Sequence, residues 1–193
     1  MDQGRQKRIS PPPSPSCSNR ESSTDSDDPH GLRSRFVLNQ AFHFRRALLE
    51  IQRGEKRTCW LWFVLPTAPY VVDGVERGSS MNRHFTLRTD EQAVEYLRLP
   101  PLELEGGEVV DLRQNYLDMA AAVREKLQGG FTMVDLFGEL DAPKAVSSFK
   151  LFRRISEKIG DDKVYDVCVE ILDDLHGGTK QKKKKNLFRI NSS

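Results

Sequence analysis

The chain has 193 residues, of which 30% are charged and 37% are hydrophobic. This length predicts one domain, and the low apolar share predicts that part of the chain lies outside its core. No apolar run reaches about 18 residues, which excludes a membrane-spanning helix. The polar N-terminus lacks an apolar leader, and three cysteines do not suit a disulfide scaffold, so we expect an intracellular, cytoplasmic protein.

The formal net charge of +2 is unevenly distributed along the chain. Residues 179–193 carry six basic side chains and no acidic one, whereas residues 32–178 carry 20 basic and 23 acidic side chains. The excess of base therefore comes from the C-terminal end. The body has a small negative net charge, which does not indicate a nucleic-acid-binding surface.

The composition divides the chain into three parts. Residues 1–31 are rich in serine, proline and acidic side chains and show no apolar periodicity, which predicts a disordered tail. Residues 179–193 are predicted to be a second, basic and flexible tail. The single domain that we expect between them covers residues 32–178.

The domain shows the three-to-four-residue spacing of apolar positions that is typical of helices. We expect a long helix from Leu32 to a glycine cap at Gly54. The apolar run 59–65 fits either a buried strand or a helical turn, and residues 67–88 are expected to be a loop with turn signals such as Asp73-Gly74. A capping-box pattern at 89–92 then predicts a short helix that ends before Pro100.

The second half of the domain predicts further helices. An apolar stripe runs from Val109 to Leu127, and a start signal at Thr132 opens a short helix that Gly138 stops. Asp141 and Asp161 are expected to cap the last two helices. The fold class that we predict is therefore all-α, a single compact domain of five or six helices, with no hairpin and with enough core to fold without metal or disulfides.

Two separate blocks of the sequence are similar to a known family. The first is 54–66, GEKRTCWLWFVLP, and the second comprises Phe137-Gly138, Asp141, Lys144, Ser147-Ser148 and Leu151-Phe152. With weaker matches at 91–100 and 177–178, they resemble the domain-of-unknown-function family numbered 1810, mostly bacterial, of which some members are labelled calpastatin. The resemblance covers about residues 28–178. It implies a compact, mainly helical domain and no established activity.

The chain departs from that family's pattern at several places. Cys59 stands where the family usually has His, and Thr67 stands where it usually has Gln. The 67–80 loop is longer, and residues 103–108 look inserted. A family site that uses the His or the Gln would therefore be altered in this chain.

The first block supplies the candidate ligand-binding residues Lys56, Arg57, Trp60 and Trp62. Cations beside aromatic rings suit a phosphate or nucleotide ligand. The alternative is that the tryptophans fill the core and that the cations complement the dipole of the preceding helix.

The second block supplies the candidates Asp141, Lys144, Ser147 and Ser148. Asp141, Lys144 and Ser148 are spaced to share one helix face, which would present a cation and a hydroxyl to a ligand. A serine nucleophile would additionally need a neutral lysine beside it. The alternative is that Asp141 is an N-cap and that the serines allow close packing. The histidines and cysteines show no zinc-site spacing, so we expect neither metal nor cofactor.

A basic run lies in the C-terminal tail, at Lys180, Lys182, Lys183, Lys184 and Lys185. It fits a nuclear-import signal or a weak, sequence-independent contact with nucleic acid. The alternative is a solvated tail without a partner.

These candidates lead to two main hypotheses. The first is a non-enzymatic, regulatory module that binds a small anionic ligand or a protein partner in a groove formed by the two blocks. The alternative is an enzyme that acts on a phosphorylated or nucleotide-derived metabolite, with Lys56 and Lys144 holding the anion. Both require that Lys56 and Lys144 lie on the same face of the domain.

Overall fold

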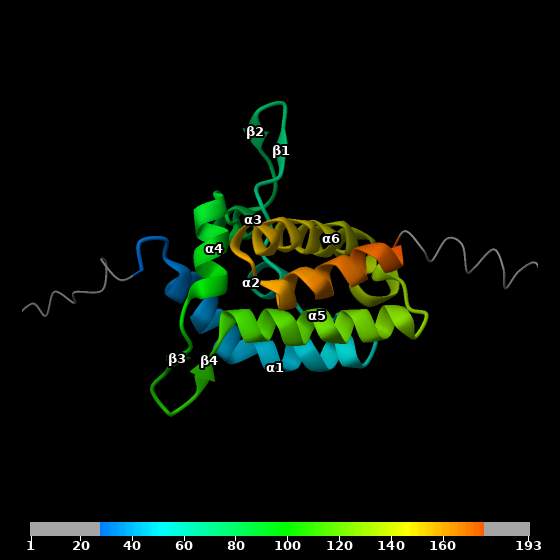
Figure 1. Cartoon of the computed structure of the whole chain (residues 1–193), viewed down its shortest axis with the longest axis horizontal. Helices are drawn as coiled ribbons and strands as arrows, with labels where there is room; N and C mark the ends of the chain where they lie inside the picture. The colour runs from blue at the N-terminus through cyan, green and yellow to red at the C-terminus, as the bar shows by residue number, and fades with distance from the viewer. Residues whose placement is uncertain (1–27, 176–193) are drawn as a thin grey trace, which may run out of the picture.

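The computed structural model describes residues 28–175. The predicted tail up to residue 27 and the basic run at 180–185 lie outside these residues. The described part is mainly helical, which confirms the predicted class (Figure 1).

Helices account for most of the described chain, and two short hairpins connect them. The helices are η1 (Arg33–Val37), α1 (Leu38–Gln52), α2 (Leu61–Val64), α3 (Ser80–Phe85), α4 (Asp90–Arg98), α5 (Leu112–Gln128) and α6 (Met133–Ile159), followed by a last helix over residues 162–175. The hairpins pair β1 (Val71–Val72) with β2 (Val75–Glu76) and β3 (Leu102–Glu103) with β4 (Val109–Val110), both antiparallel.

The helices pack around an aromatic core. α1 and α5 run side by side, and α4 crosses the end of the bundle, where it contacts α5 and α6 (Figure 1). Tyr116 from α5 and Phe152 from α6 lie with their ring centroids 4.4 Å apart, and Tyr96 from α4 lies 5.4 Å from Phe152. All three side chains are fully buried, which brings three helices to one centre.

The predicted long helix forms, but it begins as a π-helical turn, η1, that leads directly into α1. Asp28 holds this start because its carboxylate accepts the backbone N–H groups of Leu32 and Arg33, at 2.6 and 3.0 Å. The apolar run 59–65, which fitted either a strand or a helical turn, contains the short helix α2.

The expectation of a loop without hairpins over 67–88 is wrong. This segment contains β1, β2 and α3, and Asp73 (φ 51°) and Gly74 (φ 74°) form the turn between the strands. Positive φ at both positions is what a tight two-residue hairpin turn requires, and Asp-Gly supplies it. Each strand has only two residues, too few for a visible alternation in the sequence.

The predicted start of the helix over 109–127 is also corrected. Val109 and Val110 lie in β4, and α5 begins at Leu112. Asp111 is its N-cap, since its carboxylate accepts the backbone N–H of Gln114 at 2.9 Å.

Helix α6 joins two helices that the sequence predicts as separate. Its capping box is present, with Thr132 and Asp135 each accepting the other's backbone N–H. Gly138 (φ 73°, ψ 166°) interrupts the helical conformation, but the chain resumes it at once. Asp141 therefore lies inside α6, in the first turn after this kink, so its predicted role as an N-cap is wrong. The cap predicted at Asp161 is confirmed by its bond from the N–H of Val164 at 3.3 Å.

Candidate functional site

The segment between α1 and α2 is held by one buried carboxylate, Glu50. The backbone N–H groups of Arg57 and Thr58 donate to its Oε2 at 2.8 and 3.1 Å, and the Thr58 hydroxyl donates to Oε1 at 2.7 Å. The indole N–H of Trp60 also donates to Oε2, at 2.7 Å. Four donors from three residues therefore fix the 57–60 segment against the end of α1.

These hydrogen bonds determine the charge of Glu50. Burial by itself would raise the pKa of the carboxyl, but the bonds from Arg57, Thr58 and Trp60 outweigh it and lower the pKa to about 2. Glu50 is thus a carboxylate at any ordinary pH, and its role in the segment is to accept hydrogen bonds.

The first sequence block meets the second at Asp141. The ammonium group of Lys56 lies 2.7 Å from Oδ2 of Asp141, and that of Lys144 donates to Oδ1, also at 2.7 Å. The backbone N–H of Lys56 donates to the carbonyl of Leu136 at 2.7 Å, which fixes this lysine to α6 just before the kink. We call Lys56, Asp141, Lys144 and the neighbouring Trp62 the lysine cluster.

The two tryptophans of the first block have different surroundings. Trp60 is 1% exposed and packs edge-on against Phe137, with ring centroids 6.2 Å apart. Trp62 is only partly buried, and the ammonium group of Lys144 lies 4.2 Å from its ring centroid. The interpretation as core packing thus describes Trp60, whereas Trp62 lies at the surface of the lysine cluster with a cation on its ring.

The charges of the lysine cluster do not cancel. Burial would raise the pKa of Asp141, but its hydrogen bonds with Lys144 and Lys56 lower it, so one carboxylate faces two ammonium groups. Each ammonium group has three N–H donors and directs one at Asp141, which leaves donors on both for another acceptor. The side chains remain accessible, at 11% exposure for Lys56, 20% for Asp141 and 34% for Lys144.

The other candidates lie outside this cluster. The guanidinium of Arg57 is exposed and pairs with Glu55 at 3.0 Å. The hydroxyl of Ser147 donates to the carbonyl of Pro143 at 2.9 Å, and Ser148 is fully buried. Ser148 therefore does not share the accessible face of Asp141 and Lys144, contrary to the spacing argument. Within residues 28–175, no hydrogen bond joins Lys144 to either serine.

Glu50 is the residue that the sequence analysis missed. It occupies the inward side of an amphipathic helix beside Ala47 and Ile51, both fully buried. An acidic side chain at such a position is a usable signal, because a buried carboxylate needs hydrogen-bond donors close by. What the sequence does not reveal is that the donors are the backbone of the next segment.

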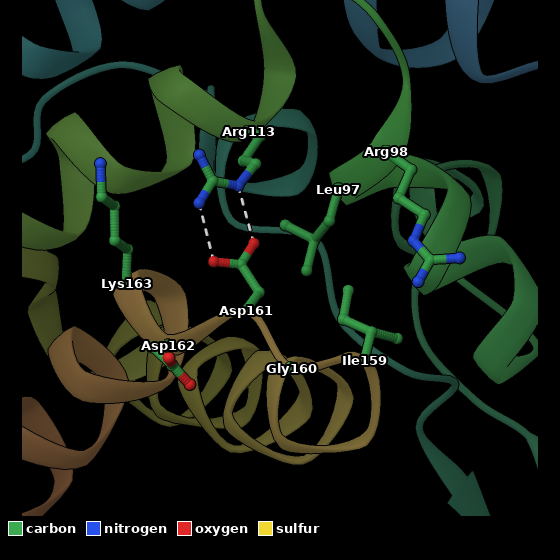
Figure 2. A pocket seen from close by; sticks show the side chains of 8 residues that line it. All are labelled: Leu97, Arg98, Arg113, Ile159, Gly160, Asp161, Asp162 and Lys163. Carbon is green, nitrogen blue, oxygen red and sulfur yellow. Dashed lines mark hydrogen bonds and ion pairs between the residues drawn. The ribbon is translucent and has the colours of Figure 1, made fainter.

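The structure also has a hollow away from the lysine cluster, shown in Figure 2. It has a volume of about 440 Å³ and lies where α6 turns into the last helix, with Leu97 and Ile159 on its wall. Arg113 and Asp161 lie next to each other in its wall, where the guanidinium donates two hydrogen bonds of 2.7 Å each to the carboxylate (Figure 2). Asp161 also caps the last helix, so this ion pair holds α5 to the turn after α6.

The described residues contain no group of three or more His, Cys, Asp and Glu side chains that could hold a metal ion. Nor is any helix among them long and apolar enough to cross a membrane. The fold and the site thus define a mainly helical domain with a lysine-rich surface cluster.

Comparisons with known proteins show the family to which the chain belongs. The family model described as "Protein of unknown function (DUF1810)" matches residues 29–188, and the chain belongs to that family. The sequence resemblance is thereby confirmed. The crystal structure of the conserved hypothetical protein Rv1873 from Mycobacterium tuberculosis is similar, with a TM-score of 0.61 and 26% identity over 78% of this chain and 91% of that chain. No curated protein matches the chain.

Proposed function

We propose that this domain is a non-enzymatic binding module and that the lysine cluster binds a small anionic ligand. The observation that carries the proposal is that Lys56 and Lys144 share the single carboxylate of Asp141. This arrangement keeps two ammonium groups together at the surface with a net positive charge and unused donors.

Two features support a ligand that carries phosphate. The backbone of Lys56 is fixed by Leu136, and the following segment is fixed by Glu50, so part of the cluster is ordered before any ligand binds. Lysine is a point charge that suits phosphate oxygens. The partly buried indole of Trp62 supplies an aromatic surface beside the charges, which suits a ligand with a ring, such as a nucleotide.

Thermal-shift and calorimetric titrations with inorganic phosphate, pyrophosphate and adenosine monophosphate would test the proposal. A ligand at about 100 times its Kd stabilises the folded state by roughly 2.7 kcal/mol. We expect Lys144→Ala and Lys56→Ala each to weaken binding about tenfold, through loss of a charge-assisted contact of about 1.4 kcal/mol.

Arg83→Ala is a suitable control, because this arginine lies on α3 and its guanidinium donates to the carbonyl of Gly78. It should leave the titration unchanged. Binding that survives both lysine substitutions would show that the ligand sits elsewhere. Absence of binding by all three anions would overturn the proposal for phosphate-bearing ligands.

A further inference from the structure

A second surface, separate from the lysine cluster, lies on the outer side of α1. Leu38, Phe42 and Leu49 are 48%, 82% and 42% exposed, although α1 is a long helix packed on α5. At 3.6 residues per turn, the three positions fall within about 40° of arc and extend over about 16 Å. They form one narrow apolar stripe along the edge of the bundle, where Figure 1 shows α1.

Cations flank this stripe, and α1 itself has no acidic side chain on this face. Arg45, Arg46 and Arg53 are all exposed, and within the part of the chain that the structure describes none of them has a carboxylate partner. The one acidic residue of α1 is Glu50, which faces inward and accepts the donors described above. The outer face of α1 is therefore apolar along its centre and positive along both sides.

We infer that the outer face of α1 is a docking surface for an amphipathic, acidic helix of a partner protein. A narrow stripe at separations of four and seven residues is the geometry of a seam between two helices. Glutamate or aspartate beside the partner's apolar residues would pair with the three arginines as the stripe is buried. Charge complementarity of this kind selects the partner and speeds association.

Two other occupants suit the surface less well. A second copy of α1 would bring its own arginines against Arg45, Arg46 and Arg53, which is repulsive. A bilayer is contacted by helices with a broad apolar face, and this stripe is only one side chain wide. A helix seated on about three turns of α1 would bury less than about 1,200 Å², the size class of transient complexes.

The test uses two synthetic helical peptides of about two heptads with the same leucine seam, one flanked by glutamate and one by lysine. Against the full chain we expect the glutamate peptide to bind with a Kd of about 1–100 μM, and the lysine peptide to bind at least tenfold more weakly. Phe42→Asp should abolish binding without lowering the melting temperature, because its side chain is exposed. The double variant Arg45→Glu, Arg46→Glu should reverse the preference between the peptides.

Tyr70→Asp and Arg77→Glu are matched controls, since both residues are exposed on the β1–β2 hairpin, and neither should change the binding. Equal affinity for the two peptides, or a preference unchanged by the double variant, overturns the inference. Two other results would overturn it: a dimer of the chain in sedimentation experiments that Phe42→Asp abolishes, or binding to phosphatidylserine vesicles, but not to the glutamate peptide, that Phe42→Asp abolishes.

Discussion

Glu50 and Asp141 are both carboxylates at which separate segments of the chain meet, and their partners differ. Glu50 is 8% exposed and accepts hydrogen bonds from backbone N–H groups, a hydroxyl and an indole. Asp141 is more exposed and accepts from two lysine ammonium groups. Backbone N–H groups cannot turn away from their acceptor, whereas the ends of lysine side chains can rotate. Glu50 therefore fixes the 57–60 segment, and under the proposed function Asp141 leaves the two lysines able to contact a ligand.

The strongest test of this difference is Glu50→Leu. The substitution leaves the Trp60 indole N–H and the donors of Arg57 and Thr58 unpaired, so we expect a loss of about 3 kcal/mol in the free energy of unfolding. Urea denaturation measures it. Glu50→Gln, which keeps one acceptor oxygen, should lose about 1–2 kcal/mol. A loss below about 1 kcal/mol for Glu50→Leu would mean that water replaces the carboxylate and that the segment is not fixed by it.

Gly138→Ala tests how α6 brings Asp141 to the lysines. A Cβ at Gly138 would meet nothing within 4 Å, so the cost arises from the backbone conformation, φ 73° and ψ 166°. This region is accessible almost only to glycine, and we expect a loss of about 2 kcal/mol. Ser147→Ala, at an exposed position of the same helix, is the control. If Gly138→Ala is neutral, the kink is not required and Asp141 can be placed by a continuous helix.

A third experiment measures how the contribution of Glu50 to stability depends on pH. The pKa of Glu50 in the folded protein is about 2, below the ordinary value of about 4.3 that it regains on unfolding. Its contribution to stability is complete above about pH 5 and is lost as the pH falls toward 2. Because Asp141 and Asp161 also have lowered pKa values, the wild type should be compared with Glu50→Gln. The stability difference between the two should shrink between pH 5 and pH 3, as followed by urea titrations at each pH; a constant difference would contradict this account.

Asp141→Asn is expected to have the smallest effect on stability, within about 0.5–1 kcal/mol, since its ion pairs are partly solvated. Its effect on ligand binding should be opposite in sign to that of the lysine variants. Without the carboxylate, both ammonium groups are free for an anion, and the affinity for pyrophosphate should rise. A fall in affinity would show that Asp141 contacts the ligand or that it is needed to hold the lysines in place.

The sequence predicts those structural elements that are determined by residues close together in the chain. The capping box at Thr132 and the cap at Asp161 depend on side chains within three residues of the backbone they bind, so pattern alone identifies them. The hairpin at Asp73-Gly74 was missed because its strands have two residues each. Spacing alone left Ser148 either on the accessible face or in a close packing contact, and its full burial decides for packing.

The candidate site, too, could be predicted from the sequence only in part. Spacing and resemblance singled out Lys56, Trp62, Asp141 and Lys144, which the structure brings together. Neither could assign Trp60 to the core or identify Glu50 as the acceptor that holds it, because these roles depend on contacts between α1 and the segment that follows.

The β1–β2 hairpin has a practical consequence. It projects from the body, and Asp73 and Gly74 at its tip are exposed (Figure 1). A protease cut or an engineered break there would give two fragments, one ending with β1 and the other beginning with β2. Neither fragment holds a complete core, since α1 packs on α5. Such fragments suit a complementation assay, in which reassembly of the fold reports that two fused proteins have come together.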